Sequence, residues 1–265
     1  MTTPAPSEGV ALEGAAPAQW RDLRRFTPAR VALGRVGNGL PTDAHLAFQA
    51  AHAAARDAVH AALDIPALLA DLRNAGLAAS VVRSACPDRP TYLLRPDLGR
   101  SLGDGSELPA APGCLALLLC DGLSATAVQR HAPALLAHLA GRLERLGPIM
   151  VAAQGRVALG DAVGESLGAE AVLVLIGERP GLTAPDSLGA YLTWRPRRGR
   201  TDAERNCVSN IRPDGLPPAQ AADKLLWLIG RMRALRLTGV ALKDEQPPPA
   251  QEHLDQDRLI SVVST

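Results

Sequence analysis

The chain has few aromatic residues and few lysines, and each of these features argues against some classes of function. Phenylalanine, tryptophan and tyrosine together make up 3% of the 265 residues, so few side chains could stack on the bases of single-stranded nucleic acid. Lys224 and Lys243 are the only lysines among 28 basic residues, which leaves few candidates for a Schiff-base nucleophile or a phosphate-loop lysine. Because 27 acidic residues balance the basic ones, no net field would attract nucleic acid or an anionic membrane.

Cysteine pairs and long apolar runs are also missing. The four cysteines are scattered and none belongs to a Cys-x-x-Cys pair, which excludes a disulfide framework and favours a reducing compartment. Residues 1–7 lack a basic region followed by an apolar run, and no segment reaches ~18 uninterrupted apolar residues. We therefore expect a soluble cytoplasmic protein without a membrane partner.

Several motifs that would identify an independent enzyme are absent. The run Gly34-Arg-Val-Gly37-Asn-Gly39 has the wrong spacing for a dinucleotide fingerprint, and no phosphate loop ends in Gly-Lys-Ser/Thr. His45, His52 and His60 are seven and eight residues apart, whereas helical metal ligands are usually three or four apart. Without paired carboxylates or a nucleophile beside a base, the sequence predicts no catalytic residue and no metal site of its own.

Composition divides the chain into four segments. Residues 1–19 are rich in Ala, Pro and Gly without periodicity and read as a disordered tail, and 20–112 read as a mainly helical N-terminal region. From 113 to 244, strand and helix patterns alternate, which predicts an α/β fold with a Rossmann-like, mainly parallel sheet flanked by helices. Residues 245–265 contain a triple proline and read as a second tail.

The individual elements follow from periodicity and from proline and glycine positions. Apolar runs of strand length and the helical spacing of apolar residues set the expected boundaries. We expect helices over 41–63 and 65–75, a short strand over 91–94, strands over 114–120, 149–153, 171–176 and 190–194, helices beginning near 124, 161 and 217, and an arginine-rich loop over 195–215.

Three phrases fall where strands end. They are Arg156-Val-Ala-Leu-Gly-Asp161, Gly177-Glu-Arg-Pro-Gly-Leu182 and Arg205-Asn-Cys-Val-Ser-Asn-Ile211. In open parallel sheets, ligands bind outside the carboxyl ends of the strands, so these phrases predict one ligand site. Glu178 and Arg179 would offer an acceptor and a donor there, although a surface salt bridge would use the same residues.

These phrases, with others in fixed order, resemble the small subunit of ethanolamine ammonia-lyase. The resemblance extends from about Phe26 to about Lys243. Its further anchors are Phe26-Thr-Pro-Ala-Arg30, Ala32-Leu-Gly-Arg-Val-Gly-Asn-Gly-Leu-Pro-Thr42, Arg95-Pro-Asp-Leu-Gly-Arg100, Asp121-Gly-Leu-Ser124 and Asp214-Gly-Leu-Pro-Pro-Ala219.

The resemblance implies a role and a set of ligand contacts. In that family a heteromeric lyase converts ethanolamine to acetaldehyde and ammonia by radical chemistry with adenosylcobalamin. It implies that Val157, Glu178 and Cys207 contact the cofactor, that a large subunit carries the substrate pocket, and that the cofactor lies between the subunits. The cofactor would perform the difficult step and the protein would supply binding and orientation.

Two other interpretations remain open at this point. The chain could be a Rossmann-like scaffold or binding protein without a corrinoid, or an oxidoreductase that uses a nucleotide cofactor. The resemblance also leaves open whether the protein lies free in the cytosol or inside a bacterial microcompartment.

Overall fold

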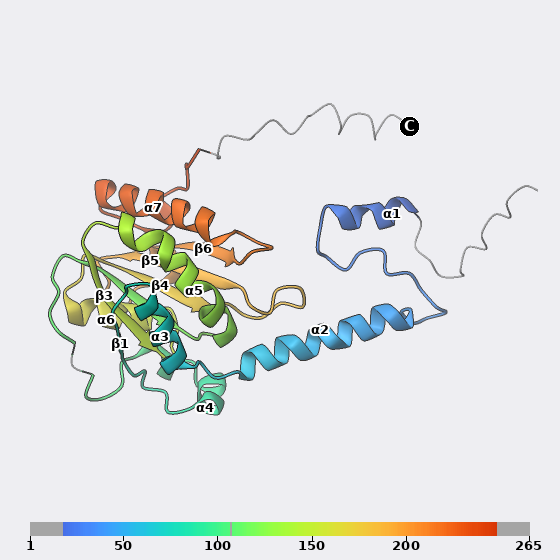
Figure 1. Cartoon of the computed structure of the whole chain (residues 1–265), viewed down its shortest axis with the longest axis horizontal. Coiled ribbons are helices and arrows are strands. Elements are labelled where there is room, and N and C mark those ends of the chain that lie inside the picture. Colours follow the sequence, from blue (N-terminus) through green and yellow to red (C-terminus); the bar gives the residue numbers. More distant parts are fainter. Residues whose placement is uncertain (1–17, 107, 248–265) are drawn as a thin grey trace, which may run out of the picture.

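One six-stranded sheet organises residues 18–106 and 108–247, the parts of the chain that the computed structural model describes (Figure 1). Its spatial order is β1-β3-β2-β4-β5-β6. The strands are β1 (Ala79–Val81), β2 (Leu115–Cys120), β3 (Leu146–Ala152), β4 (Ala171–Gly177), β5 (Leu188–Trp194) and β6 (Arg205–Ile211).

Strand direction changes across the sheet. The neighbours among β1, β3, β2 and β4 run parallel, whereas β5 is antiparallel to β4 and β6 is antiparallel to β5. The α/β class is confirmed, but the sheet is mixed, so the Rossmann-like, mainly parallel description is not. The physical reason is the short connection 178–187, since a parallel crossover needs a dozen or more residues.

The helices are α1 (Ala18–Asp22), α2 (Thr42–His60), α3 (Ile65–Asn74), α4 (Arg89–Leu94), α5 (Ala125–Leu139), α6 (Leu159–Leu167) and α7 (Pro218–Leu235). Short 3-10 turns lie at Leu23–Arg25, Leu98–Arg100, Ala140–Arg142, Asp202–Glu204 and Gly239–Ala241. The helices predicted over 41–63 and 65–75 and those beginning near 124, 161 and 217 are confirmed within a few residues.

The two faces of the sheet are covered unequally. Along β2, Leu115, Leu117 and Leu119 pack toward one face with residues of α3, α5 and α7. Ala116, Leu118 and Cys120 pack toward the other face, where α6 is the helix that supplies buried residues. All six residues of β2 are buried, which explains why the strand reads as an unbroken apolar run.

The strand predicted over 91–94 is wrong, because this segment belongs to α4. The Asp88 side chain caps the helix by accepting a hydrogen bond from the Thr91 amide at 2.8 Å. Pro90 lies in the first turn, where the missing amide hydrogen costs nothing. The segment is therefore a short capped helix, despite its β-favouring Thr91 and Tyr92.

The loop predicted over 195–215 is also wrong, since it contains β6. The strand pairs with β5 from Leu188 opposite Ile211 to Thr193 opposite Arg205. Its apolar pattern is weak because a charged residue, Arg205, occupies one of its buried positions.

Helix α2 projects from the sheet and its helices as an arm (Figure 1). Ala58 is its only buried residue. Strand β1 lies before the boundary predicted near residue 113, yet it pairs with β3. The division into domains stays a prediction, and the tails predicted over 1–19 and 245–265 lie almost entirely outside the described residues.

Candidate functional site

A cavity of about 400 Å³ opens at the carboxyl ends of β2 and β4. Its wall includes Val157, just before α6, and Glu178, the first residue after β4. The strand-end argument from the sequence thus brings two of the three predicted residues into one cavity. Tyr191 of β5 also lines it, although the sequence gave no reason to select this residue.

Two glycines let the cavity floor form. Gly122 has a left-handed φ of 53°, and a Cβ there would lie 2.2 Å from the Gly177 carbonyl oxygen. A Cβ on Gly177 would lie 2.0 Å from the Ser124 carbonyl oxygen. A side chain at either position would therefore push the ends of β2 and β4 apart.

The Glu178 carboxylate ties three segments together. Its Oε1 accepts a hydrogen bond from the Ser209 hydroxyl at 2.5 Å, and its Oε2 accepts one from the backbone N–H of Asn210 at 3.1 Å. The Ser187 hydroxyl also donates to Oε2. A carboxylate has about four acceptor positions, so little capacity remains for a ligand.

Cys207 lies in β6 directly opposite Tyr191 of β5, so their side chains share one face of the sheet. Cys207 is exposed and does not line the cavity itself. Desolvation raises the pKa of its thiol despite a hydrogen bond with Tyr191 that acts in the opposite sense. Burial likewise raises the pKa of the Tyr191 phenol, so both groups are neutral at pH 7.

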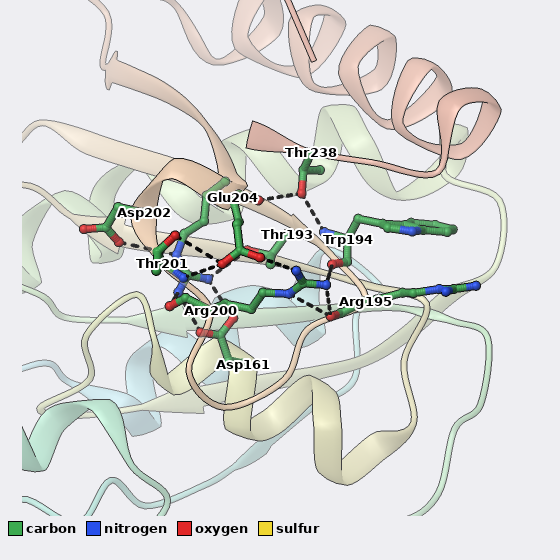
Figure 2. A network of polar contacts seen from close by, with 10 residues as sticks. Asp161, Thr193, Trp194, Arg195, Arg200, Thr201, Asp202, Glu204 and Thr238 are labelled. Carbon is green, nitrogen blue, oxygen red and sulfur yellow. Dashed lines mark hydrogen bonds and ion pairs between the residues drawn. The ribbon is translucent and has the colours of Figure 1, made fainter. Parts of the chain in front are cut away.

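A buried ion pair fixes the segment that carries Val157. The Arg205 guanidinium donates two hydrogen bonds of 2.6 Å to the two carboxylate oxygens of Asp161, in the first turn of α6. Both side chains are 2% exposed. This pair joins the first and third phrases of the sequence and anchors α6, which follows Val157, against β6. Figure 2 labels Asp161, the α6 member of the pair.

A second group of charged residues includes Arg156, which lines the cavity. Two guanidinium groups contact the Tyr92 ring, with Arg156 at 4.3 Å and Arg89 at 4.9 Å from its centroid. Arg89 also pairs with Asp121 at 3.1 Å, and burial raises the pKa of that carboxyl. The Arg156 Nε is buried, lacks a hydrogen-bond acceptor among the described residues and belongs to a side chain that lines the cavity.

The arrangement can bind but offers little for chemistry. It combines an apolar wall at Val157, a neutral phenol at Tyr191 and an unsatisfied donor at Arg156. Within residues 18–106 and 108–247, no group of three or more His, Cys, Asp or Glu could hold a metal ion. Nor does any helix of this part of the chain have the length and apolar character needed to cross a membrane.

A larger cavity, of about 640 Å³, lies at the outer edge of the sheet near the ends of β1 and β3. Ser84 and Gln154 line it, but none of the three predicted site residues does. We therefore choose the candidate site by its lining residues and not by its volume. The smaller cavity is favoured because Val157 and Glu178 both line it.

Comparison with known proteins gives one consistent result. Residues 17–243 match the family model described as ethanolamine ammonia-lyase light chain (EutC). An ethanolamine ammonia-lyase small subunit from Bradyrhizobium diazoefficiens is 55% identical over 88% of this chain and 93% of its own length. The small subunits from Azotobacter vinelandii, 55% identical over 85% of this chain and 88% of its own, and Xanthomonas campestris, 52% identical over 87% and 89%, are similar.

Proposed function

Because the chain belongs to the ethanolamine ammonia-lyase light chain family, we propose that it is the small subunit of a heteromeric, adenosylcobalamin-dependent lyase. The enzyme would convert ethanolamine to acetaldehyde and ammonia. In this proposal the chain supplies one wall of the cofactor site, and the large subunit supplies the other wall and the substrate pocket.

One observation carries the proposal. Val157 and Glu178, which the resemblance assigns to the cofactor, line the same cavity, and Cys207 lies opposite a third lining residue, Tyr191. These residues come from three segments that are far apart in the sequence. Their convergence supports a shared ligand rather than three separate packing roles.

The residues present fit an edge of a corrinoid. A cavity of about 400 Å³ is too small to enclose the whole macrocycle but can hold a peripheral group. Corrin side chains end in amides, whose carbonyl oxygens would accept hydrogen bonds from the guanidinium of Arg156, a residue that lines the cavity. Val157 would pack on the apolar ring edge, and Tyr191 would offer its phenol as a donor.

The chain's own contribution in this proposal is binding and orientation. When bound, adenosylcobalamin supplies a carbon-centred radical through homolysis of its cobalt–carbon bond. The Asp161–Arg205 pair would hold the segment of Val157 in position against the cofactor, and the hydrogen bonds to Glu178 would hold the loop after β4. Neutral Cys207 and Tyr191 would contact it without adding charge.

We propose that the complex is cytoplasmic, either free in the cytosol or inside a bacterial microcompartment. All four cysteines are free, as a reducing compartment favours.

A scaffold without a corrinoid is the second candidate, and one observation favours it. Three donors of the same chain already occupy the Glu178 carboxylate, and in this candidate function its role is to join loops. The absorption spectrum of the assembled complex separates the two functions, since bound corrinoid colours the protein red.

The direct test is reconstitution with a candidate large subunit. We expect the chain alone to release no ammonia from ethanolamine, and addition of the large subunit and adenosylcobalamin to give turnover and a corrinoid spectrum. A competent large subunit that is equally active with and without this chain would refute the proposal.

Glu178→Ala tests the site in the assembled enzyme. With three donors on the carboxylate, about one acceptor position remains for a corrin amide N–H. Loss of that one charge-assisted hydrogen bond would cost about 1.5–3 kcal/mol, so we expect the Kd for adenosylcobalamin to rise about 10- to 100-fold. Ser209→Ala is the matched control, because it removes one tie to the carboxylate and keeps the carboxylate itself. Equal cofactor affinity in both variants and the wild type would limit Glu178 to joining loops.

A further inference from the structure

The opposite edge of the sheet contains a cavity that the proposed function does not use. Its volume is about 530 Å³, and it lies where β2, β3 and β4 begin and β5 ends. Four arginines line it: Arg145, Arg195, Arg233 and Arg236.

Positive charge is in excess in this cavity. Its acidic lining residues are Glu144 and Glu170. The Glu170 carboxylate accepts a hydrogen bond from Arg233 at 2.8 Å and lies 3.8 Å from the Arg145 guanidinium. Within the described residues, the guanidinium groups of Arg195 and Arg236 have neither an ion pair nor a hydrogen-bond acceptor. These two cations are the ones that remain available to an anion.

The backbone at three of these arginines is left-handed. The φ angles are 54° at Arg145, 45° at Arg195 and 55° at Arg236. This conformation is unfavourable for residues with a Cβ, and glycine or asparagine usually occupies it. Among the described residues six non-glycine positions have a positive φ, and half of them are arginines of this one cavity. Arg236 is the left-handed C-cap that ends α7, a common way for a helix to end. Arg145 and Arg195 have no such explanation, and two strained positions at one cavity point to a functional site.

Helix polarity explains only part of the cluster. Helix α7 ends at Leu235, so the negative end of its dipole attracts Arg233 and Arg236. Arg145 precedes β3 and Arg195 follows β5, and neither belongs to a helix. A need for positive charge in the cavity accounts for all four.

A hydrogen-bond network holds the Trp194–Arg195 wall of the cavity. The Arg200 guanidinium donates to the Arg195 carbonyl oxygen at 3.0 Å, and the Trp194 amide donates to the Thr238 hydroxyl at 2.9 Å. Figure 2 shows the side chains of Trp194 and Arg195 extending the same way, out of this network. The indole and the guanidinium therefore form a positioned pair, with the guanidinium carbon 6.0 Å from the ring centroid.

We propose that this cavity binds a small molecule with two or more phosphate groups, of the nucleoside diphosphate class. Arg195 and Arg236 would bind the phosphates, since guanidinium groups form bidentate pairs with phosphate oxygens. The Trp194 indole would pack against the planar base. This site is separate from the proposed cofactor site, and its ligand does not depend on a corrinoid.

Calorimetric titration of the full chain with pyrophosphate and with ADP tests the site. We expect both to bind, with ADP tighter through its base, and the affinity to fall as salt rises. The double variant Arg195→Gln/Arg236→Gln should weaken binding of both at least 10-fold. The control Arg56→Gln/Arg100→Gln removes the same charge from exposed positions outside the cavity and should leave binding unchanged.

Three results would overturn the proposal. The first is no binding of pyrophosphate or ADP at millimolar concentration. The second is equal weakening by the double variant and its control, which would reduce the effect to net charge. The third is binding to the free chain that disappears when the large subunit is added, which would assign the arginines to carboxylates of that subunit.

Discussion

Helices α2 and α5 are both rich in alanine, yet they have opposite surroundings. Helix α5 connects β2 to β3 and buries eight of its 15 residues against the sheet and α7. Helix α2 is longer, with 19 residues, and buries only Ala58. Its larger apolar side chains, Leu46 and Phe48, are exposed. Helix formation therefore does not determine burial: a crossover between paired strands must cover the sheet, while a helix ahead of the sheet has no such constraint.

The two regions should respond differently to mutation. In the body around the sheet, side chains are held by packing and by buried polar pairs, so each loss leaves a cavity or an unpaired group. On α2 most side chains already face solvent, so the same substitutions remove few contacts. Two predictions use this contrast and a third extends it to a polar loop, from the largest expected effect to the smallest.

Asp161→Asn should have the largest effect, because it removes the buried partner of the Arg205 charge and leaves only Asp202, whose side chain is fully exposed. Breaking a buried pair in this way costs about 3–5 kcal/mol of unfolding free energy. Urea denaturation should show a lower midpoint with an unchanged slope. Glu165→Gln is the control, since Glu165 lies on the same helix and pairs with Arg198 in solvent, where such pairs contribute about 0–1 kcal/mol. A similar loss in both variants would contradict the role given to burial.

The Asp161–Arg205 pair also shows where sequence reasoning stops. The phrases that contain these residues were recognisable, and the strand-end rule correctly brought Val157 and Glu178 to one cavity. The pairing itself was not predictable, because it depends on the register of β6 against β5. That strand escaped prediction because the buried charge of Arg205 interrupts its apolar pattern.

Other elements differ in how much signal the sequence contained. Strand β2 was predictable because it is buried on both faces and is apolar throughout. The direction of β5 could have been inferred from the short connection 178–187, and α4 from Asp88 and Pro90, which mark a capped first turn. Tyr191 left no local signal, since only the pairing of β5 with β6 places it beside Cys207.

Leu117→Ala and Leu46→Ala make the comparison between body and arm direct. Leu117 is 0% exposed in the core, and its truncation should cost about 2–5 kcal/mol of unfolding free energy. Leu46 is 56% exposed on α2, so its truncation should change the unfolding free energy by less than about 0.5 kcal/mol. Chemical denaturation of both variants in the isolated chain provides the measurement. A loss above about 1.5 kcal/mol for Leu46→Ala would show that the arm packs on the body in solution.

Glu204 gives the smallest effect and tests a third region, the loop between β5 and β6, where polar contacts replace packing. The Thr201 amide donates to its carboxylate at 2.8 Å, and the Arg200 guanidinium donates as well; together they lower the pKa of Glu204 from its ordinary 4.5 to about 2. Since the folded pKa lies below the unfolded one, the stabilisation is complete above pH ~4.5 and is lost as the pH falls toward about 2. The difference in Tm between the wild type and Glu204→Gln should therefore shrink between pH 5 and pH ~2, and the carboxyl should titrate near 2 by NMR. A Glu204 titration near 4.5 would mean that these polar contacts do not form in solution. The ordered part of the molecule would then end where side-chain packing ends.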